Sequence, residues 1–250
     1  MKRKVNIAIL GDSISEGIGS KKYNYCNLLK QNIEIETDVT CTVKNFAYTG
    51  TTIEYANEIF KDVLDFKPDI IISFYGNVDA MVRPKITGKP NYYSLIPKRF
   101  KKNGMLDPRP FYSSNKVRCF FEHIDSFIRY NLKKILLKLQ GDYCWVNIES
   151  FIEEYELFLE RVSSANCKIF MVSTVVVDEY YFPGTQKNYR KYNKCIEKIA
   201  NDKGANYIDV YNPLSKYNWD DVFNKDHFHP NTNGYKILAS ILTDNILEVL

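Results

Sequence analysis

The sequence predicts an α/β fold in which a parallel sheet is covered by helices on both faces. Short runs rich in isoleucine and valine recur along the chain, and segments with helical apolar spacing lie between them. The polar and glycine residues of chemical interest come just after several of these runs. This placement agrees with a parallel sheet, because such sheets carry their chemistry at the carboxyl ends of their strands.

The amino-terminal part of the chain predicts three strands with helices between them. Residues 5–10 form a β-branched run that stops at a glycine, residues 39–46 alternate apolar and polar side chains, and residues 69–75 are dense in isoleucine. Residues 25–33 have helical spacing. Residues 51–66 begin with two threonines that can cap a helix, and a proline follows its end.

Residues 80–114 interrupt this alternation. The segment is rich in Pro, Gly, Lys and Tyr and is too long for an ordinary connection, so we expect it to be functional or mobile. Residues 116–140 then predict a long helix with its apolar side chains on one side. The last predicted elements alternate again: a helix at 147–163, a strand at 168–172, a helix at 186–202, a strand at 206–210 and a helix at 231–250.

Length and composition are those of one ordinary domain, residues 1–250, because 45% of the 250 residues are apolar and 26% are charged. No run of about eighteen apolar residues predicts a membrane span, and the basic start leads directly into the first strand rather than into a secretory leader. We therefore expect a cytoplasmic protein. The six cysteines are scattered, with neither a C-x-x-C pair nor a histidine cluster, so we expect reduced thiols and no metal site.

The net charge of +4 hides a strong asymmetry. Residues 83–140 contain 14 Lys and Arg against 3 Asp and Glu, a net charge of +11, and the rest of the chain carries −7. The simplest interpretation is a solvated face with a docked amphipathic helix at 116–140. Two alternatives are recognition of an anionic substrate and peripheral contact of this helix with an anionic membrane surface. Nucleic acid fits least, because no nucleic-acid-binding module is recognisable.

Residues suited to acyl transfer lie near the two ends of the chain. The first strand leads into Gly11-Asp12-Ser13, and Asp226 precedes His229 by three residues near the carboxyl terminus. A serine hydroxyl is a weak nucleophile unless a base takes its proton, and an imidazole serves better as that base when a carboxylate orients it. A lone Gly-Asp-Ser triplet is more often a helix cap, but the ordered acid and base favour a nucleophile.

Three segments resemble sequence blocks of the SGNH (GDSL-type) hydrolase family, which is named for its catalytic Ser, Gly, Asn and His. They are GDSISEG at residues 11–17, NFAYTGTT at residues 45–52, and DHFHPN at residues 226–231 with a Gly-Tyr pair at 234–235. The resemblance implies a flavodoxin-like, three-layer α/β/α fold with a five-stranded parallel sheet. The basic segment then becomes an insertion after the third strand, at about residues 80–145.

The resemblance also implies a role for each site residue. Ser13 would be the nucleophile, His229 the general base and then acid, and Asp226 the group that orients His229. The implied donors to the oxyanion are the backbone N–H groups of Ser13 and Gly50 and the side-chain amide of Asn77. Each fixed donor aimed at a developing oxyanion is worth about 2.7–4 kcal/mol.

The third block departs from the family pattern. The family usually has Gly-x-Asn-Asp, whereas this chain has GNVD at residues 76–79. Aligned on the asparagine, Val78 replaces the acid; aligned on the glycine, Val78 replaces the asparagine. We take Asn77 as the donor and Asp79 and Arg83 as candidate substrate-binding residues. With Arg-Pro at 83–84, this form resembles members associated with bacterial surface-polysaccharide pathways, which favours a carbohydrate substrate.

These expectations combine into one function. We expect a serine esterase that removes a small acyl group, most simply acetyl, from a small-molecule or glycan ester through an acyl-enzyme on Ser13, with no cofactor. Activity should rise with pH as His229 loses its proton. An O-acyltransferase would use the same triad, so it stays open as an alternative. A third interpretation is a binding or scaffold protein that has lost the reaction. The presence of Ser13, Asp226 and His229 argues against it.

Overall fold

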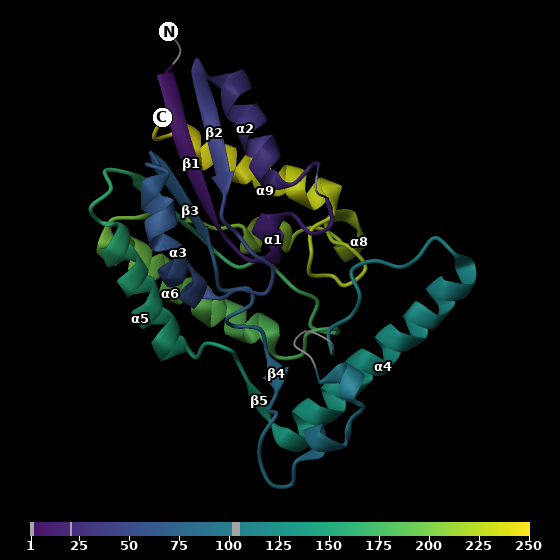
Figure 1. Ribbon diagram of the computed structural model, residues 1–250. Helices are drawn as coiled ribbons and strands as arrows, with labels where there is room; N and C mark the ends of the chain where they lie inside the picture. Colours follow the sequence, from purple (N-terminus) through teal and green to yellow (C-terminus); the bar gives the residue numbers. More distant parts are fainter. Residues whose placement is uncertain (1–2, 21, 102–105) are drawn as a thin grey trace.

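The computed structural model describes residues 3–20, 22–101 and 106–250 (Figure 1). At its centre lies a five-stranded sheet with the spatial order β2-β1-β3-β6-β7, in which every neighbouring pair is parallel. The strands are β1 (Arg3–Gly11), β2 (Val39–Asn45), β3 (Ile70–Phe74), β6 (Lys168–Val172) and β7 (Asn206–Ile208). The predicted parallel sheet is therefore confirmed.

Helices cover both faces of this sheet, which gives three layers (Figure 1). On one face α2 packs against α9, and on the other α5 packs against both α3 and α6. The bounds of these helices are α2 (Tyr25–Glu36), α9 (Thr232–Leu247), α3 (Ile53–Asp65), α5 (Ile148–Val162) and α6 (Thr185–Lys203). The predicted α/β/α sandwich is confirmed.

The core sits between these layers. All five residues of β3 are buried, because helices cover both faces of the strand, and four of the five are therefore apolar. The fifth, Ser73, is buried with its hydroxyl 2.9 Å from the hydroxyl of Tyr155. Three short helices were not predicted, since four residues are too few to show a helical period. They are α1 (Ser13–Glu16), α7 (Tyr211–Leu214) and α8 (Trp219–Val222).

The basic insertion is closed at its base by a small antiparallel pair of strands. They are β4 (Arg83–Pro84) and β5 (Asp142–Tyr143). Between them come two 3-10 turns (Tyr92–Leu95 and Lys98–Phe100) and the long helix α4 (Lys116–Gln140), which projects from the body of the molecule (Figure 1). A separate small cluster of apolar side chains holds the turns to α4: Ile96, Phe100, Leu106 and Leu136.

Helix α4 begins and ends where the sequence predicts, but its docked side differs from the expectation. The residues it buries are Ser126, Arg129, Lys133 and Leu136. Most of the predicted apolar stripe is between 40% and 68% exposed instead: Val117, Phe120, Phe121, Ile124, Phe127, Ile135 and Leu139. The expectation that this stripe docks the helix therefore holds only for Ile128, Leu132 and Leu136 and is wrong for the other seven residues. Burial of the charged side is stabilised by ion pairs with Asp125 and Asp107, which the helical period does not reveal.

Among the described residues, no helix has both the length and the apolar character needed to cross a lipid bilayer.

Candidate active site

Ser13 lies where the first strand ends and a short helix begins. Asp12 caps this helix, since its side chain accepts a hydrogen bond from the backbone N–H of Ile14 at 2.9 Å. Ser13 is the first residue of α1, and the N–H groups of a first helical turn have no acceptor within the helix. The tight turn from β1 into α1 thus presents both a hydroxyl and an available amide at the carboxyl end of a central strand.

The loop after β2 is held against this turn. The carboxylate of Glu16, in α1, accepts hydrogen bonds from the backbone N–H and the hydroxyl of Thr49, at 2.7 and 2.5 Å. The next residue, Gly50, has φ of +79°, a left-handed conformation that glycine adopts without strain. A Cβ added to Gly50 would meet no atom within 4 Å, so the loop leaves open space beside this residue.

The last loop before α9 carries the acid and the imidazole. One oxygen of Asp226 accepts hydrogen bonds from the backbone N–H groups of Phe228 and His229, both at 3.1 Å. Its other oxygen lies 2.6 Å from Nδ1 of His229. The carbonyl of His229 accepts a further bond from the backbone N–H of Asn224 at 2.8 Å. The loop therefore fixes both the backbone and the ring of His229.

The two ends of the chain meet in one hydrogen-bonded series of side chains. Oγ of Ser13 lies 2.9 Å from Nε2 of His229, whose Nδ1 faces Asp226. The hydroxyl of Tyr235, in α9, lies 3.1 Å from the carbonyl of Ile14 and 2.8 Å from that of Ile18, which ties the late helix to the serine turn. The structure thus brings together the serine, the histidine and the aspartate that the sequence singled out.

These side chains open into a cavity of about 640 Å³. Ser13, Gly50, Asp226 and His229 are among its lining residues. The sequence did not single out another group of lining residues, which come from the insertion: Asp107, Pro108, Arg109, Pro110, Arg129 and Trp145. The excess of basic residues in the insertion was the available signal for them, but no spacing pattern linked it to Ser13.

Asn77 does not line this cavity, which corrects the expectation that its amide reaches the oxyanion. Its side chain is fully buried, and its carbonyl oxygen accepts a hydrogen bond from the backbone N–H of Val175 at 2.9 Å. Its Nδ2 is buried near the carboxyl of Asp12 and makes no hydrogen bond in the described part of the chain. Burial raises the pKa of Asp12 to about 6, and the amide of Asn77 opposes part of that rise. The side chain of Asn77 is therefore part of the buried interior and does not face the cavity.

Asp79 is also an interior residue, and its placement corrects the expectation that it contacts substrate. Its two carboxyl oxygens accept hydrogen bonds from the backbone N–H groups of Ile53 and Gly76, at 2.8 and 2.9 Å. Burial raises the pKa of Asp79 to about 7. Val78, between the two misassigned residues, is the one that lines the cavity with Ser13. The alignment on the glycine, with Val78 in place of asparagine, fits this geometry.

Arg83 does border the cavity, as expected of a candidate substrate-binding residue. Its guanidinium lies over the ring of Trp145, with 3.8 Å between the guanidinium carbon and the ring centroid. Its Nη1 donates hydrogen bonds to the carbonyls of Val78 and Met81, at 2.9 and 3.1 Å. The position of Arg83 is thus fixed by the same loop that places Val78 at the cavity.

Comparison with known proteins gives one family match and many similar folds. The sequence matches the model of the GDSL-like Lipase/Acylhydrolase family over residues 9–237. No curated protein is similar enough in sequence to count as a match.

Three solved structures illustrate the similar folds. The lipase/acylhydrolase from Enterococcus faecalis has a TM-score of 0.64 at 19% identity, over 99% of this chain and 97% of that one. A catalytic mutant of Axe2, an acetylxylan esterase from Geobacillus stearothermophilus, has a TM-score of 0.64 at 12% identity, over 98% and 96%. The acetyl xylan esterase AlAXEase has a TM-score of 0.61 at 15% identity, over 97% and 100%.

At these sequence identities the similarity to solved structures supports only the fold. The match to the family model, in contrast, spans most of the chain. It includes both the Ser13 turn and the loop of Asp226 and His229. The chain therefore belongs to the GDSL-like lipase/acylhydrolase family and is a hydrolase.

Proposed function

We propose that this protein is a serine esterase that releases a small acyl group, most simply acetyl, from a hydroxyl of a carbohydrate-like substrate. The observation that carries the proposal is the continuous series from Ser13 Oγ through both ring nitrogens of His229 to Asp226, with distances of 2.9 and 2.6 Å. This series opens into a cavity large enough for a sugar-sized ester.

In the proposed reaction, Oγ of Ser13 attacks the ester carbonyl while Nε2 of His229 takes the hydroxyl proton. The carboxylate of Asp226 holds the Nδ1 proton of the ring, so that Nε2 is the free acceptor, and it stabilises the imidazolium that forms. His229 then protonates the leaving alcohol, which leaves an acyl-enzyme on Ser13. A water molecule repeats the same steps and releases the acid and the free serine.

The oxyanion that forms in each step is stabilised by two backbone donors in this proposal, the N–H groups of Ser13 and Gly50. Preorganised amides are effective because they need no reorganisation when charge develops. The apolar side chain of Val78 cannot donate a hydrogen bond to the oxyanion, whereas the amide of an asparagine at this position could. The site should therefore work with a smaller stabilisation of the intermediate than a three-donor site provides.

The substrate class is supported by two observations. Cavity-lining residues combine apolar side chains with arginines and an aspartate, which suits a polyhydroxylated alcohol. Two of the similar structures are described as acetyl xylan esterases, so the same fold carries carbohydrate ester chemistry elsewhere. We keep the cytoplasm as the proposed location, supported by six cysteines that are all free thiols.

Labelling with a fluorophosphonate tests the proposed nucleophile. We expect the wild-type protein to take up one label and a Ser13→Ala variant with an unchanged melting temperature to take up none. A labelled Ser13→Ala variant, or a folded wild-type protein that stays unlabelled, would overturn the mechanism. Hydrolysis of acetylated sugars, measured with and without an acceptor alcohol, then separates an esterase from an acyltransferase, because only the latter makes transfer product in excess of free acetate.

A further inference from the structure

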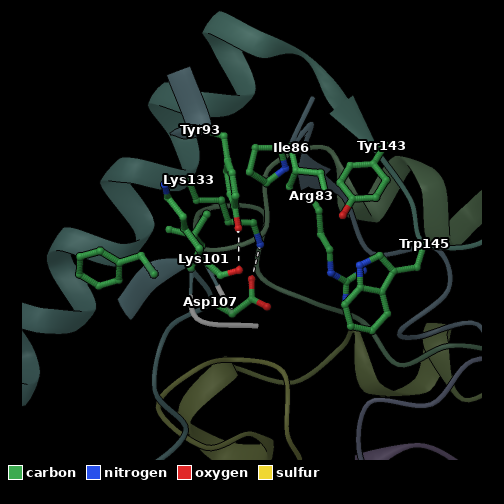
Figure 2. Close-up of a pocket in the computed structure, with 11 residues that line it drawn as sticks. Arg83, Ile86, Tyr93, Lys101, Asp107, Lys133, Tyr143 and Trp145 are labelled. Atoms are coloured by element: carbon green, nitrogen blue, oxygen red, sulfur yellow. Dashed lines mark hydrogen bonds and ion pairs between the residues drawn. The ribbon is translucent and has the colours of Figure 1, made fainter. Parts of the chain in front are cut away.

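A second, smaller cavity adjoins the one over Ser13, and we call it the inner pocket. It measures about 110 Å³ and lies within the insertion (Figure 2). Three side chains border both cavities: Arg83, Asp107 and Trp145. The inner pocket and the catalytic cavity are therefore neighbours, and the side chain of Arg83 lies between them.

Arg83 is held in one orientation at this junction. Figure 2 shows its guanidinium against the indole of Trp145, and its Nη1 is already committed to the carbonyls of Val78 and Met81. Its Nε is buried and has no hydrogen-bond partner in the part of the chain that the structure describes. A guanidinium fixed in this way offers its remaining N–H groups as a preformed fork, with little entropy left to lose on binding.

The inner pocket also contains more positive than negative charge. Arg83, Lys101 and Lys133 line it, and Asp107 is the acid among its lining residues. Asp107 already forms an ion pair with the fully buried Lys133, with 2.5 Å between Oδ1 and Nζ (Figure 2). The ammonium of Lys101 donates to the carbonyl of Ser94 at 2.6 Å. Across residues 3–20, 22–101 and 106–250, Arg83 makes no ion pair with an acid. Arg83 is partly buried, and a bound anion would compensate its positive charge where no acid of the chain does.

We propose that the inner pocket binds a carboxylate or phosphate group carried by the alcohol part of the ester, with Arg83 as the residue that contacts it. The proposal rests on the proposed esterase function and states which substrates the esterase prefers. The planar guanidinium matches the two oxygens of such a group, and bonds between charged partners are stronger than neutral ones. The enzyme then prefers the acetyl ester of an acidic or phosphorylated sugar over that of a neutral sugar.

The test compares three acetylated substrates: methyl glucoside, which is neutral, methyl glucuronoside, which carries a carboxylate, and glucose 1-phosphate. For the wild-type enzyme we expect kcat/KM for at least one acidic ester to exceed that for the neutral ester by about tenfold or more. Arg83→Gln should remove most of this preference, and Arg83→Lys should restore part of it because the charge returns without the fork. Lys194→Gln, an equal change of charge on the exposed side of α6, should keep the wild-type preference.

The outcomes decide whether the inner pocket binds an anion, independently of whether the protein is an esterase. A wild-type enzyme that hydrolyses the neutral ester at least as well as both acidic ones overturns the anion site and leaves the esterase standing. The same holds if Arg83→Gln lowers kcat/KM for all three substrates by one common factor, because that pattern is a structural effect of lost carbonyl bonds. If Arg83→Gln fails to fold, the wild-type comparison alone decides.

An independent observation concerns the outer face of α4. Seven large apolar side chains of this helix are exposed, as described above, and they follow one side over its whole length. Monomeric proteins rarely expose a continuous apolar stripe of this kind. Basic side chains lie along or beside the stripe, among them Lys116, Arg118, Lys134 and Lys138, whereas the acid Glu122 is engaged by Arg118 and the N–H of Ser113.

We infer that this face lies on an anionic lipid surface. An apolar stripe flanked by lysine and arginine is the pattern of helices that rest in the membrane interface. A second copy of the chain fits less well. Antiparallel pairing of two α4 helices would bring Lys116 near Lys138, and parallel pairing would bring equal lysines together, so both arrangements oppose like charges.

Sedimentation with vesicles tests this surface. We expect binding to vesicles with 30% phosphatidylglycerol in phosphatidylcholine, and at least about tenfold weaker binding to pure phosphatidylcholine. A Phe120→Glu, Phe121→Glu variant should lose binding to the anionic vesicles, whereas Ile35→Glu, at an exposed apolar site on α2, should retain it. No binding by the wild-type protein overturns the inference. So does a dimer in analytical ultracentrifugation that the double variant abolishes, because it assigns the face to a second copy.

Discussion

Replacing Asp226 by asparagine isolates the orienting role of its carboxylate. Asparagine can keep one oxygen as acceptor for the backbone N–H groups of Phe228 and His229, so we expect the loop to stay folded. Its NH₂ group then stands 2.6 Å from Nδ1 of His229, where the carboxylate oxygen was, and it can only donate. The ring must therefore carry its proton on Nε2. An imidazole with that tautomer cannot accept the proton of Ser13.

The size of the effect follows from this exchange of tautomers. In the serine-protease triad the same substitution lowers kcat by about 10⁴ with the geometry intact, equivalent to about 5.5 kcal/mol of transition-state stabilisation. The bond between Asp226 and His229 is short and the carboxylate is buried, so we expect a loss of about 10³–10⁴ in kcat. KM should change much less, because the exchange alters proton transfer rather than substrate contacts.

A second Asp–His pair beside this loop supplies the matched control. The carboxylate of Asp178 lies 2.7 Å from Nδ1 of His227, with the same chemistry as the proposed catalytic pair, but neither residue lines the cavity. Steady-state hydrolysis of a neutral acetyl ester should show Asp178→Asn within about twofold of wild type and Asp226→Asn almost inactive. If Asp226→Asn keeps more than about a tenth of the wild-type kcat, or if both variants lose activity equally, the orienting role is refuted.

Three further predictions concern the same site. Val78→Asn places an amide at the wall of the cavity that Ser13 also lines, and we expect kcat for a neutral acetyl ester to rise at least about tenfold. Val78→Leu is the apolar control. An unchanged kcat in a folded Val78→Asn variant contradicts the idea that a donor is missing there. Gly50→Ala forces alanine to φ of +79°, at a cost of about 1–2 kcal/mol, and shifts the proposed donor, so kcat should fall by at least about tenfold while the melting temperature falls only slightly. Burial raises the pKa of Asp79 to about 7, well above its unfolded value near 3.8. The native state therefore holds this proton more tightly than the unfolded chain, so the contribution of Asp79 to stability is full below about pH 4 and is lost as the pH rises to about 7. A difference of about three pH units corresponds to about 4 kcal/mol, and chemical denaturation across this range should show a steeper fall for wild type than for Asp79→Asn; equal slopes would contradict the buried acid.

The hydrogen bonds around Asp79 also explain why its loss should affect the site without touching substrate. Its carboxyl group joins the start of α3, at Ile53, to the loop after β3, at Gly76. Gly50 stands just before that helix, and Val78 stands in that loop. The spacing between Gly50 and Val78, which both line the cavity, thus depends on one buried carboxyl group.

The sequence by itself determined the sheet, its covering helices and the order of the candidate triad. Isoleucine-rich runs such as residues 70–72 identify strands because a parallel strand buried on both faces is mostly apolar. Ser13 was recognisable because it follows a strand and a glycine, and the late loop because Asp226 and His229 stand three residues apart. These signals are local, so a single chain reveals them without knowledge of the partners across the fold.

Only the tertiary structure decided which side chains face the cavity. Asn77 and Val78 are adjacent, and the choice between them depends on the backbone N–H of Val175, which is distant in sequence and holds the side chain of Asn77 in the interior. The docked side of α4 depends in the same way on Asp107, which makes burial of Lys133 tolerable and leaves the apolar stripe outside. A periodic pattern measures one element alone, whereas burial of a polar group is settled by the partner that the rest of the chain brings to it.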